Sequence, residues 1–281
     1  MQIEGWRYYV YAAIPTTAPH MPVDLTPVED GRIWSVDDRK PLLVRYTSDF
    51  DCGYETNWWY VIKDTPFDLS ALKAKRRYEI TKGIKNFEVR QIVPQEYAET
   101  LYEVAYASYQ QYPAAYRPRI DRDEYVQSVQ DWVDCQCYGA FDRETGELCG
   151  YALLYPDGKY MDFRVMKTVP ASERKGINAA LTYGILEACN DFLATGGYLC
   201  DGSRNINHET AFQDYLEKYF GFRKAYCKLH IRYKGIMGLV IKCAFPFRNA
   251  LRRLDGIGVI HLVNGLLKME EMTAKREKKD E

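Results

Sequence analysis

The sequence predicts a mixed α/β fold in which helices cover both sides of a mostly antiparallel sheet. Three observations lead to this prediction. A strand-like stretch runs directly into a long amphipathic helix within residues 159–192. From Phe87 onward, segments with strand and helix periodicity follow one another. Apolar residues make up 47% of the chain and charged residues 27%, which is typical of a globular protein.

Length and charge narrow the possible functions. A chain of 281 residues is long enough for one large domain or two modest ones. The net charge of −1 argues against a general nucleic-acid binder. No signal peptide and no apolar run of about 20 residues is found, so we expect a cytoplasmic protein.

The cysteines indicate neither disulfides nor a metal site. The chain has 8 of them, scattered along its length, and the close pair Cys135 and Cys137 lacks a second pair at zinc-finger spacing. We therefore expect buried free thiols in a reducing cytoplasm and no bound metal.

The first 86 residues contain the weakest patterns. Residues 5–14 form a strand or a short helix, and residues 42–46 and 58–62 have the composition of strands. A helix is predicted from Ser70 to Gly83, with the glycine closing it. Its basic face is either solvated or a patch for an anionic acceptor; the basic residues are Lys73, Lys75, Arg76, Arg77 and Lys82.

Residues 87–158 show clear alternation between strand and helix. Phe87–Val93 alternates like a half-buried strand, and a helix follows from Pro94 to about Tyr112. Asp121 is the expected N-cap of a second helix. A hairpin is then predicted from strands at residues 137–141 and 148–155.

The stretch from residue 159 to 192 organises the chain. Residues 159–168 form a strand, Pro170 ends it, and Ser172 is the expected N-cap of the next helix. Apolar residues recur at helical spacing from Ile177 to Phe192, as in a helix packed on a sheet.

The turn between this strand and this helix is a candidate anion site. Residues 173–176 would point backbone amides at one spot, where the helix dipole adds positive charge. Arg174 and Lys175 add full charges, and Gly176 has no side chain to hold a ligand away. The turn therefore suits a phosphate or pyrophosphate. The alternative is an ordinary strand–helix connection with a solvated basic turn.

The rest of the chain adds two strands, one helix and a tail. We expect a short strand at residues 198–200, a helix at 209–220 and a long strand at 222–233. The tail, residues 238–281, contains one or two packing helices. Alternatively, it forms an amphipathic surface that makes weak contact with a membrane or with a partner.

This order of elements resembles the GCN5-related N-acyltransferase (GNAT) superfamily. In that family a turn with the pattern Gln/Arg-x-x-Gly-x-Gly/Ala holds the pyrophosphate of coenzyme A. The matching turn here is Glu173 to Asn178, in which only Gly176 fits the pattern, although Arg174 and Lys175 keep the local charge. The resemblance implies a coenzyme A thioester, acetyl-CoA above all, as acyl donor. It also implies a set of donor-binding residues: Val165, Met166, Lys167, Glu173, Arg174, Lys175, Gly176, Ile177, Asn178 and Asn207.

Two further matches concern the ends of the domain. The stretch from Asn207 to Phe222 is similar to the closing helix of the family, where a tyrosine lies near the departing thiolate; Tyr215 and Tyr219 both fit that role. Residues 72–89 resemble the entry into the acyltransferase domain of Fem-type proteins, which pair two such domains. The resemblance thus implies a divergent N-terminal half-domain at 1–86, a GNAT-like domain at 87–235 and a C-terminal helical tail at 236–281.

Acyl transfer also needs a polarised carbonyl and a base. A backbone N–H between Arg164 and Thr168 would polarise the donor carbonyl where the strand leaves its neighbour. The candidate bases are three carboxylates, with Asp162 preferred, and two imidazoles: Asp162, Glu88, Asp201, His208 and His230.

Three functions remain open at this point. The first is an acyl-CoA N-acyltransferase acting on an amine of a small molecule or of a cell-envelope or polysaccharide precursor. The second is a Fem-type transferase that takes its donor from charged tRNA, against which the net charge of −1 argues weakly. The third is a non-catalytic binding protein on the same scaffold. Nucleic acid is expected as a partner only in the second case.

Overall fold

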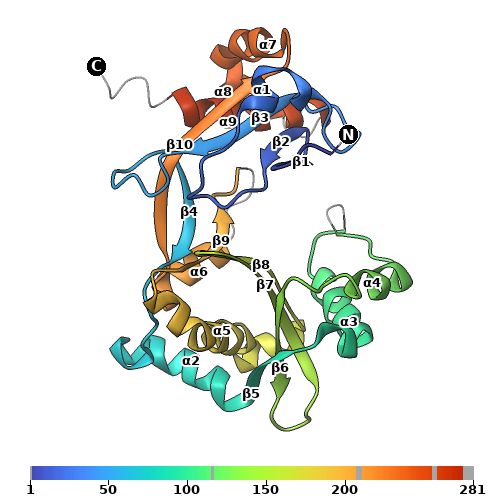
Figure 1. Ribbon diagram of the computed structural model, residues 1–281. Coiled ribbons are helices and arrows are strands. Elements are labelled where there is room, and N and C mark those ends of the chain that lie inside the picture. Colours follow the sequence, from blue (N-terminus) through green and yellow to red (C-terminus); the bar gives the residue numbers. More distant parts are fainter. Residues whose placement is uncertain (1, 115–116, 207–210, 255–257, 275–281) are drawn as a thin grey trace. The chain divides into compact units, whose positions relative to one another are not determined.

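The computed structural model describes residues 2–114, 117–206, 211–254 and 258–274. The chain divides into two compact units, each built from separate stretches of sequence. Unit 1 comprises Met1–Val61, Ser203–Ala211 and Lys224–Glu281; unit 2 comprises Ile62–Gly202 and Phe212–Arg223. Figure 1 labels the elements of both units.

Unit 2 contains a sheet with the strand order β9-β8-β7-β6-β5. All neighbouring strands in it are antiparallel except β8 and β9, which are parallel. The predicted hairpin is confirmed as β6 and β7. The strands are β5 (Phe87–Ile92), β6 (Gln136–Asp142), β7 (Leu148–Asp157), β8 (Tyr160–Thr168) and β9 (Tyr198–Ser203).

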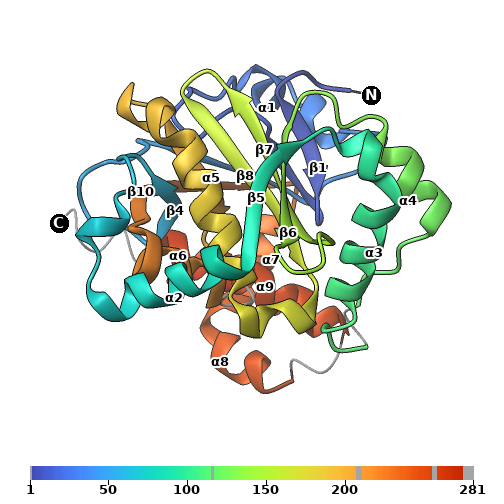
Figure 2. The ribbon, with the colours of Figure 1, turned by 90° about the horizontal axis from the view of Figure 1, so that it is seen from below.

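Helices lie on both faces of this sheet (Figures 1 and 2). The long helix α5 (Ile177–Ala194) packs on one face beside α2 (Ala74–Asn86). On the other face, α3 (Ala98–Tyr109) and α4 (Arg122–Val129) bury apolar side chains against β5, β6 and β7. Helix α6 (Ala211–Phe220) precedes the last strand. Short 3₁₀ helices are η2 (Leu69–Ala71), η3 (Pro94–Tyr97) and η4 (Pro170–Lys175).

Unit 1 joins strands that lie far apart in the sequence. Strand β3 pairs antiparallel with β10, although more than 170 residues separate them, and β2 pairs parallel with β3. The order is β1-β2-β3-β10-β4. The strands are β1 (Trp6–Tyr9), β2 (Ala12–Pro15), β3 (Leu43–Ser48), β10 (Arg223–Tyr233) and β4 (Trp58–Lys63), the last through Val61 in this unit.

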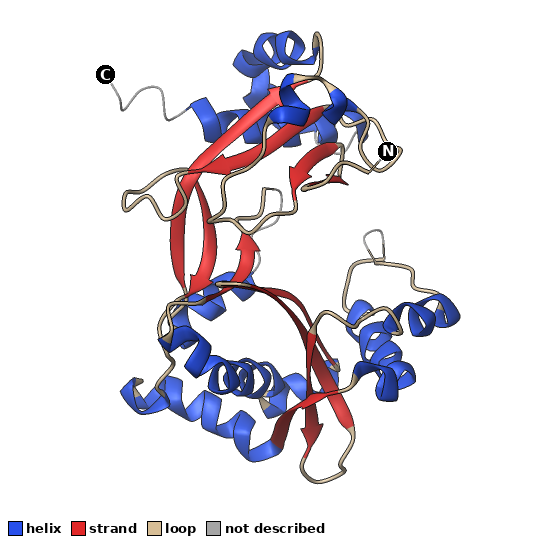
Figure 3. Cartoon of the chain, in the orientation of Figure 1, coloured by secondary structure: helices blue, strands red, loops and turns tan. Residues whose placement is uncertain are grey.

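Alternation along β3 builds the two cores of unit 1. Leu43 packs against Ile241, Leu266 and Leu267 of the C-terminal helices, whereas Val44 packs in a separate cluster with residues of the N-terminal segment. Figure 3 shows the C-terminal helices against the strands of this unit. The helices are α1 (Thr26–Glu29), η1 (Arg32–Trp34), α7 (Met237–Ala244), η5 (Phe245–Phe247), α8 (Arg248–Leu251), η6 (Arg252–Leu254) and α9 (Gly258–Ala274).

The structure confirms the predicted fold class, a mixed and mostly antiparallel sheet flanked by helices. Asp121 is the N-cap of α4, where its carboxylate accepts hydrogen bonds from the Asp123 and Glu124 amides. The predicted cap at Ser172 is wrong, because α5 begins at Ile177 with Gly176 as its N-cap and Ser172 lies buried in η4.

Gly83 does not close its helix either. Helix α2 continues to Asn86, and Gly83 lies inside it where the helix approaches α5. The predicted boundary between residues 86 and 87 therefore lies within unit 2, at the junction of α2 and β5.

Candidate active site

The two parallel strands of unit 2 stop pairing after the first third of β8. Strands β8 and β9 pair only from Tyr160 to Asp162 and from Tyr198 to Cys200, after which β8 continues to Thr168. The pairing of β8 with β7 shifts register between Leu153 and Leu154, so that Arg164 is an extra residue on β8. The divergence lies where the sequence places the carbonyl-polarising amides, Arg164 to Thr168.

Asp201 lies at this divergence, next to the last paired residue of β9. Its carboxylate accepts a hydrogen bond from the Gln213 side chain of α6. Burial, with a smaller effect of the nearby negative charge of Asp162, raises the pKa of Asp201 to about 7, although the hydrogen bond from Gln213 lowers it. A carboxylate that titrates near neutrality can take up a proton during a reaction and release it afterwards.

Asp162, the preferred base in the sequence analysis, is held in an ion pair. Its Oδ2 lies 2.8 Å from the Nε of Arg164, the extra residue of β8. The Arg164 guanidinium also lies over the Tyr155 ring, 4.0 Å from its centroid. Asp162 is thus placed to act on Asp201 through its charge.

Helix α6 brings aromatic side chains to the same strand. Phe212 meets Phe163 of β8 edge to face at 6.2 Å, and Tyr215 stacks on Phe212 at 6.1 Å between ring centroids. Tyr219 lies 5.1 Å from Tyr215. Burial, and then the proximity of Tyr219 and Glu79, raises the pKa of Tyr215, so its phenol stays protonated and can donate a hydrogen bond.

The turn before α5 is engaged by its neighbours. Gly176 has a φ of 89°, and a Cβ placed on it would lie 3.1 Å from the Cα of Gly83 in α2. The side of Gly176 that lacks a side chain therefore faces α2. Lys175 forms a 2.8 Å ion pair with Asp142, and Glu173 accepts a 3.0 Å hydrogen bond from Gln111.

The remaining donor-binding candidates lie around this turn. Asn178 accepts a 2.9 Å hydrogen bond from Thr168, and Ile177 is fully buried. Arg174 is exposed. The first amides of α5 have no intrahelical partner by the geometry of an α-helix.

On β8, Val165 packs with the α3–α4 cluster, and Met166 lies 4.0 Å from the hydroxyl of Thr182 on α5. The Nζ of Lys167 is 4.3 Å from the ring centroid of Tyr109, and burial lowers the pKa of this lysine.

The other candidate bases are distributed over the two units. Glu88 lies 3.8 Å from Arg143 in unit 2. In unit 1, His230 shares a 2.8 Å hydrogen bond with Ser48 and stacks on Tyr46. Asn207 and His208 lie outside the described residues.

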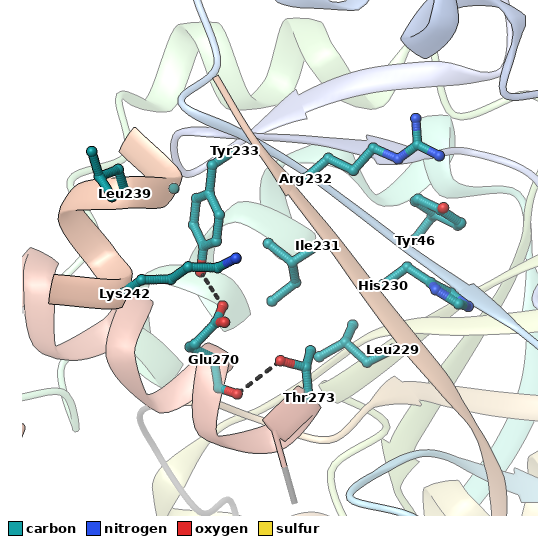
Figure 4. Close-up of a pocket in the computed structure, with 11 residues that line it drawn as sticks. Tyr46, Leu229, His230, Ile231, Arg232, Tyr233, Leu239, Lys242, Glu270 and Thr273 are labelled. Atoms are coloured by element: carbon teal, nitrogen blue, oxygen red, sulfur yellow. Dashed lines mark hydrogen bonds between the residues drawn. The ribbon is translucent and has the colours of Figure 1, made fainter. Parts of the chain in front are cut away.

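Unit 1 contains a cavity of about 890 Å³ beside β10. Figure 4 shows its polar side chains on both sides of the strand. Tyr233 donates a 2.9 Å hydrogen bond to Glu270, with the Lys242 amine nearby, whereas His230 and Arg232 lie on the other side. No sequence pattern indicated this cavity, because its walls come from β3, β10, α7 and α9.

Within the described ranges, no cluster of three or more His, Cys, Asp or Glu side chains is placed to hold a metal ion. Sequence reasoning missed Gln213, the hydrogen-bond donor to Asp201. Nothing in its sequence context marks it, since its role depends on where α6 packs.

Solved structures share the fold of this chain. No protein-family model matches the sequence, and a comparison with curated protein sequences finds no match either. L-PGS from Bacillus licheniformis matches with a TM-score of 0.51 and 12% identity, over 86% of this chain and 84% of that one. At this identity the likeness establishes a shared fold alone.

Two other matches have lower TM-scores. FemX matches with a TM-score of 0.49 and 10% identity, over 78% of this chain and 81% of its own. The PaiA N-acetyltransferase of Thermoplasma acidophilum, solved with coenzyme A, matches with a TM-score of 0.34 and 21% identity, over 47% of this chain and 87% of its own. The likeness to L-PGS supports the predicted fold of the chain, and the structures similar to it include an N-acetyltransferase and FemX.

Proposed function

We propose that this protein is an N-acyltransferase that moves an acyl group from a coenzyme A thioester, acetyl-CoA in the first instance, to an amine. The environment of Asp201 is the observation that supports this proposal most directly. It combines burial, a hydrogen bond from Gln213 and a pKa of about 7 at the divergence of β8 and β9. Acyl transfer to an amine needs a base with these properties beside a strand that can polarise a carbonyl.

The chemistry proceeds by direct attack. The amine nitrogen attacks the thioester carbonyl while Asp201 accepts a proton from it, and the oxygen that becomes negative is stabilised by an amide of Arg164–Thr168. The C–S bond then breaks, and Tyr215 donates a hydrogen bond to the departing thiolate. No cysteine of the protein takes part in these reaction steps.

The donor would be held at the turn before α5. Its pyrophosphate would meet the first amides of α5 and the exposed Arg174. Lys175 and Gly176 act indirectly in this arrangement: Lys175 is paired with Asp142, and Gly176 allows α2 to approach.

The test is product formation from acetyl-CoA and a panel of primary amines, followed by mass spectrometry. We expect Asp201→Asn to lower turnover at pH 7.5 by 10²-fold or more, since a positioned base contributes about 10²–10⁴-fold. The control is Asp157→Asn, an exposed carboxylate at the far end of β7, which should keep full activity.

Donor binding needs a separate experiment. Arg174→Glu should weaken acetyl-CoA binding by calorimetry at least tenfold, whereas Arg119→Glu, another exposed arginine, should not change it. If wild-type protein fails to bind acetyl-CoA, the thioester donor is excluded.

A second candidate is transfer of an aminoacyl group from charged tRNA, as in Fem-type proteins. One observation favours it: Lys175 and Gly176 of the expected pyrophosphate turn are engaged by Asp142 and Gly83. Product formation from aminoacyl-tRNA, together with the absence of acetyl-CoA binding, would select this candidate. The role of Asp201 as base is the same in both.

A further inference from the structure

Helix α7 in unit 1 presents apolar side chains to solvent. Ile236 is 78% exposed, Leu239 65%, Val240 49% and Phe247 65%. Ile236, the N-cap of α7, has the i, i+3, i+4 and i+7 spacing of one helical face with Leu239, Val240 and the exposed Cys243, and Phe247 follows in η5. This spacing places the four side chains along one face of α7, which is called the apolar stripe below.

The inward face of the same helix is already packed. Ile241 is 1% exposed and lies in a cluster with Leu43, Leu266 and Leu267, while Met237, Ala244 and Phe245 pack against that cluster. The exposed stripe is therefore additional to the core contacts of α7. A helix that is apolar on both faces needs a second apolar environment.

The surroundings of the stripe are basic. Between Lys234 and Leu254 the sequence contains no Asp or Glu, and its charged residues are Lys234, Lys242, Arg248, Arg252 and Arg253. Lys242, Arg252 and Arg253 are exposed. Arg248 and Arg252 contact Glu271 of α9, which leaves the segment positive overall.

Leu254, at the end of η6, is also exposed over 50% of its area. Most of the other large exposed apolar side chains of the described residues are tyrosines, and three of these side chains, Tyr9, Val10 and Tyr11, are consecutive at the turn between β1 and β2. A concentration of exposed aliphatic residues marks an interaction surface. Surfaces that lie on an anionic bilayer combine apolar side chains with flanking Lys and Arg, as this segment does.

We propose that residues 236–254 lie on the surface of an anionic lipid bilayer. The apolar stripe of α7, with Phe247 and Leu254, enters the boundary between headgroups and acyl chains, and Lys242 and Arg253 meet the lipid phosphates. The contact is interfacial: no helix in the described part of the chain is long and apolar enough to cross a bilayer.

The test is co-sedimentation of the full chain with vesicles of phosphatidylglycerol or of phosphatidylcholine. We expect binding to the anionic vesicles at least tenfold tighter than to the neutral ones, and weakening with salt. The double variant Leu239→Gln/Phe247→Gln should lose at least tenfold in affinity. The matched control is Val133→Gln, which changes a side chain that is 72% exposed elsewhere and should bind as the wild type does.

The cations are tested separately. Lys242→Gln and Arg253→Gln should each weaken binding to anionic vesicles about fivefold, since each cation near such a surface contributes about 1 kcal/mol. Circular dichroism melts of all variants establish that they fold.

Two results would overturn the proposal. One is that wild-type protein does not co-sediment with vesicles at any phosphatidylglycerol content. The other is a dimer, seen by analytical ultracentrifugation without lipid, that the Leu239→Gln/Phe247→Gln variant abolishes; the stripe would then join two copies of this chain.

Discussion

Asp201 has an environment that its sequence neighbours do not reveal. The polar stretch after Cys200 has the composition of a loop, in which a carboxylate is ordinarily solvated, but β9 continues through it to Ser203. Its burial, its hydrogen bond from Gln213 and its proximity to Asp162 all depend on how α6 and β8 pack around it. The sequence therefore includes Asp201 among its candidates, but offers no reason to prefer it.

The raised pKa of Asp201 predicts how stability depends on pH. The folded state holds the proton up to about pH 7, whereas an unperturbed aspartate loses it near 3.8. Between these values the folded state binds more protons, so the contribution of Asp201 to folding stability falls as pH rises from about 4 to 7. Above pH 7 Asp201 is ionised in both states, and the full free-energy cost of burying its charge lowers the stability of the fold.

Asp201→Asn should therefore stabilise the protein most at neutral and higher pH. We expect a gain of about 1–3 kcal/mol at pH 8 and a smaller gain at pH 5, allowing for partial solvent access. Urea unfolding of wild-type protein and the variant at pH 5 and pH 8 measures the two gains in stability. An equal gain at pH 5 and pH 8 would show that Asp201 does not titrate between them.

Tyr215 and Tyr219 allow a matched comparison. Tyr215 stacks on Phe212, which contacts Phe163 of β8, whereas Tyr219 reaches that cluster through Tyr215. We expect Tyr215→Phe to lower the turnover number about 10–100-fold and Tyr219→Phe to change it little. The turnover number of each variant, measured with the same acceptor amine, shows which tyrosine assists the leaving thiolate. The reverse order of effects would assign the role to Tyr219.

At the scale of elements, the packing of α5 on α2 and on β5 depends on two glycines. A Cβ on Gly83 would overlap the carbonyl oxygen of Gly176, and one on Gly184 would overlap Val89 of β5. These glycines let α5 lie close to both a helix and a strand. In the sequence alone Gly83 resembles the end of a helix, because glycine serves both at helix ends and at close helix contacts, and only the tertiary contact distinguishes the two.

Gly83→Ala should consequently destabilise unit 2. Helix propensity alone favours alanine by up to about 1 kcal/mol, but the overlap with Gly176 outweighs this, and we expect a net loss of about 1–3 kcal/mol. The control is Gly258→Ala in α9, where a Cβ would meet nothing within 4 Å. Thermal melts compare the two variants, and a Gly83→Ala protein at least as stable as the wild type would contradict this packing.

Local elements were predictable where a periodic pattern or a cap determines them. The hairpin of β6 and β7, the strand β8 and the cap at Asp121 follow from sequence neighbours. The start of α5 could not be predicted in this way. Pro170 and Ser172 suit the N-terminus of an α-helix, but they form a 3₁₀ helix that Gly176 caps.

At the scale of the whole molecule, the chain passes repeatedly between its two units. Strand β3 pairs with β10, which is distant in sequence, and α7 and α9 cover Leu43 of β3. Pairing between strands so distant in sequence leaves no local pattern. The sequence therefore indicated a divergent N-terminal segment and a helical tail without indicating that they share a core.

Loss of the C-terminal helices should thus affect the N-terminal strands. In a protein that ends at Gly235, we expect the amides of β3 to lose hydrogen-exchange protection, while those of β7 and α5 in unit 2 keep theirs. The matched full-length variant Leu267→Ala should lower the protection of β3 in part. Unchanged protection of β3 in both would contradict the shared core.

The central claim is that Asp201 is the base of an acyl transfer. Its most direct test is the pH profile of turnover for wild-type protein and Asp201→Asn, with an acceptor amine whose own pKa lies well away from 7. The account predicts that wild-type turnover rises with pH to a plateau with a midpoint near pH 7, and that the variant is both slow and without this midpoint. A variant that retains the midpoint, or wild-type turnover that is independent of pH between 6 and 8, would contradict it.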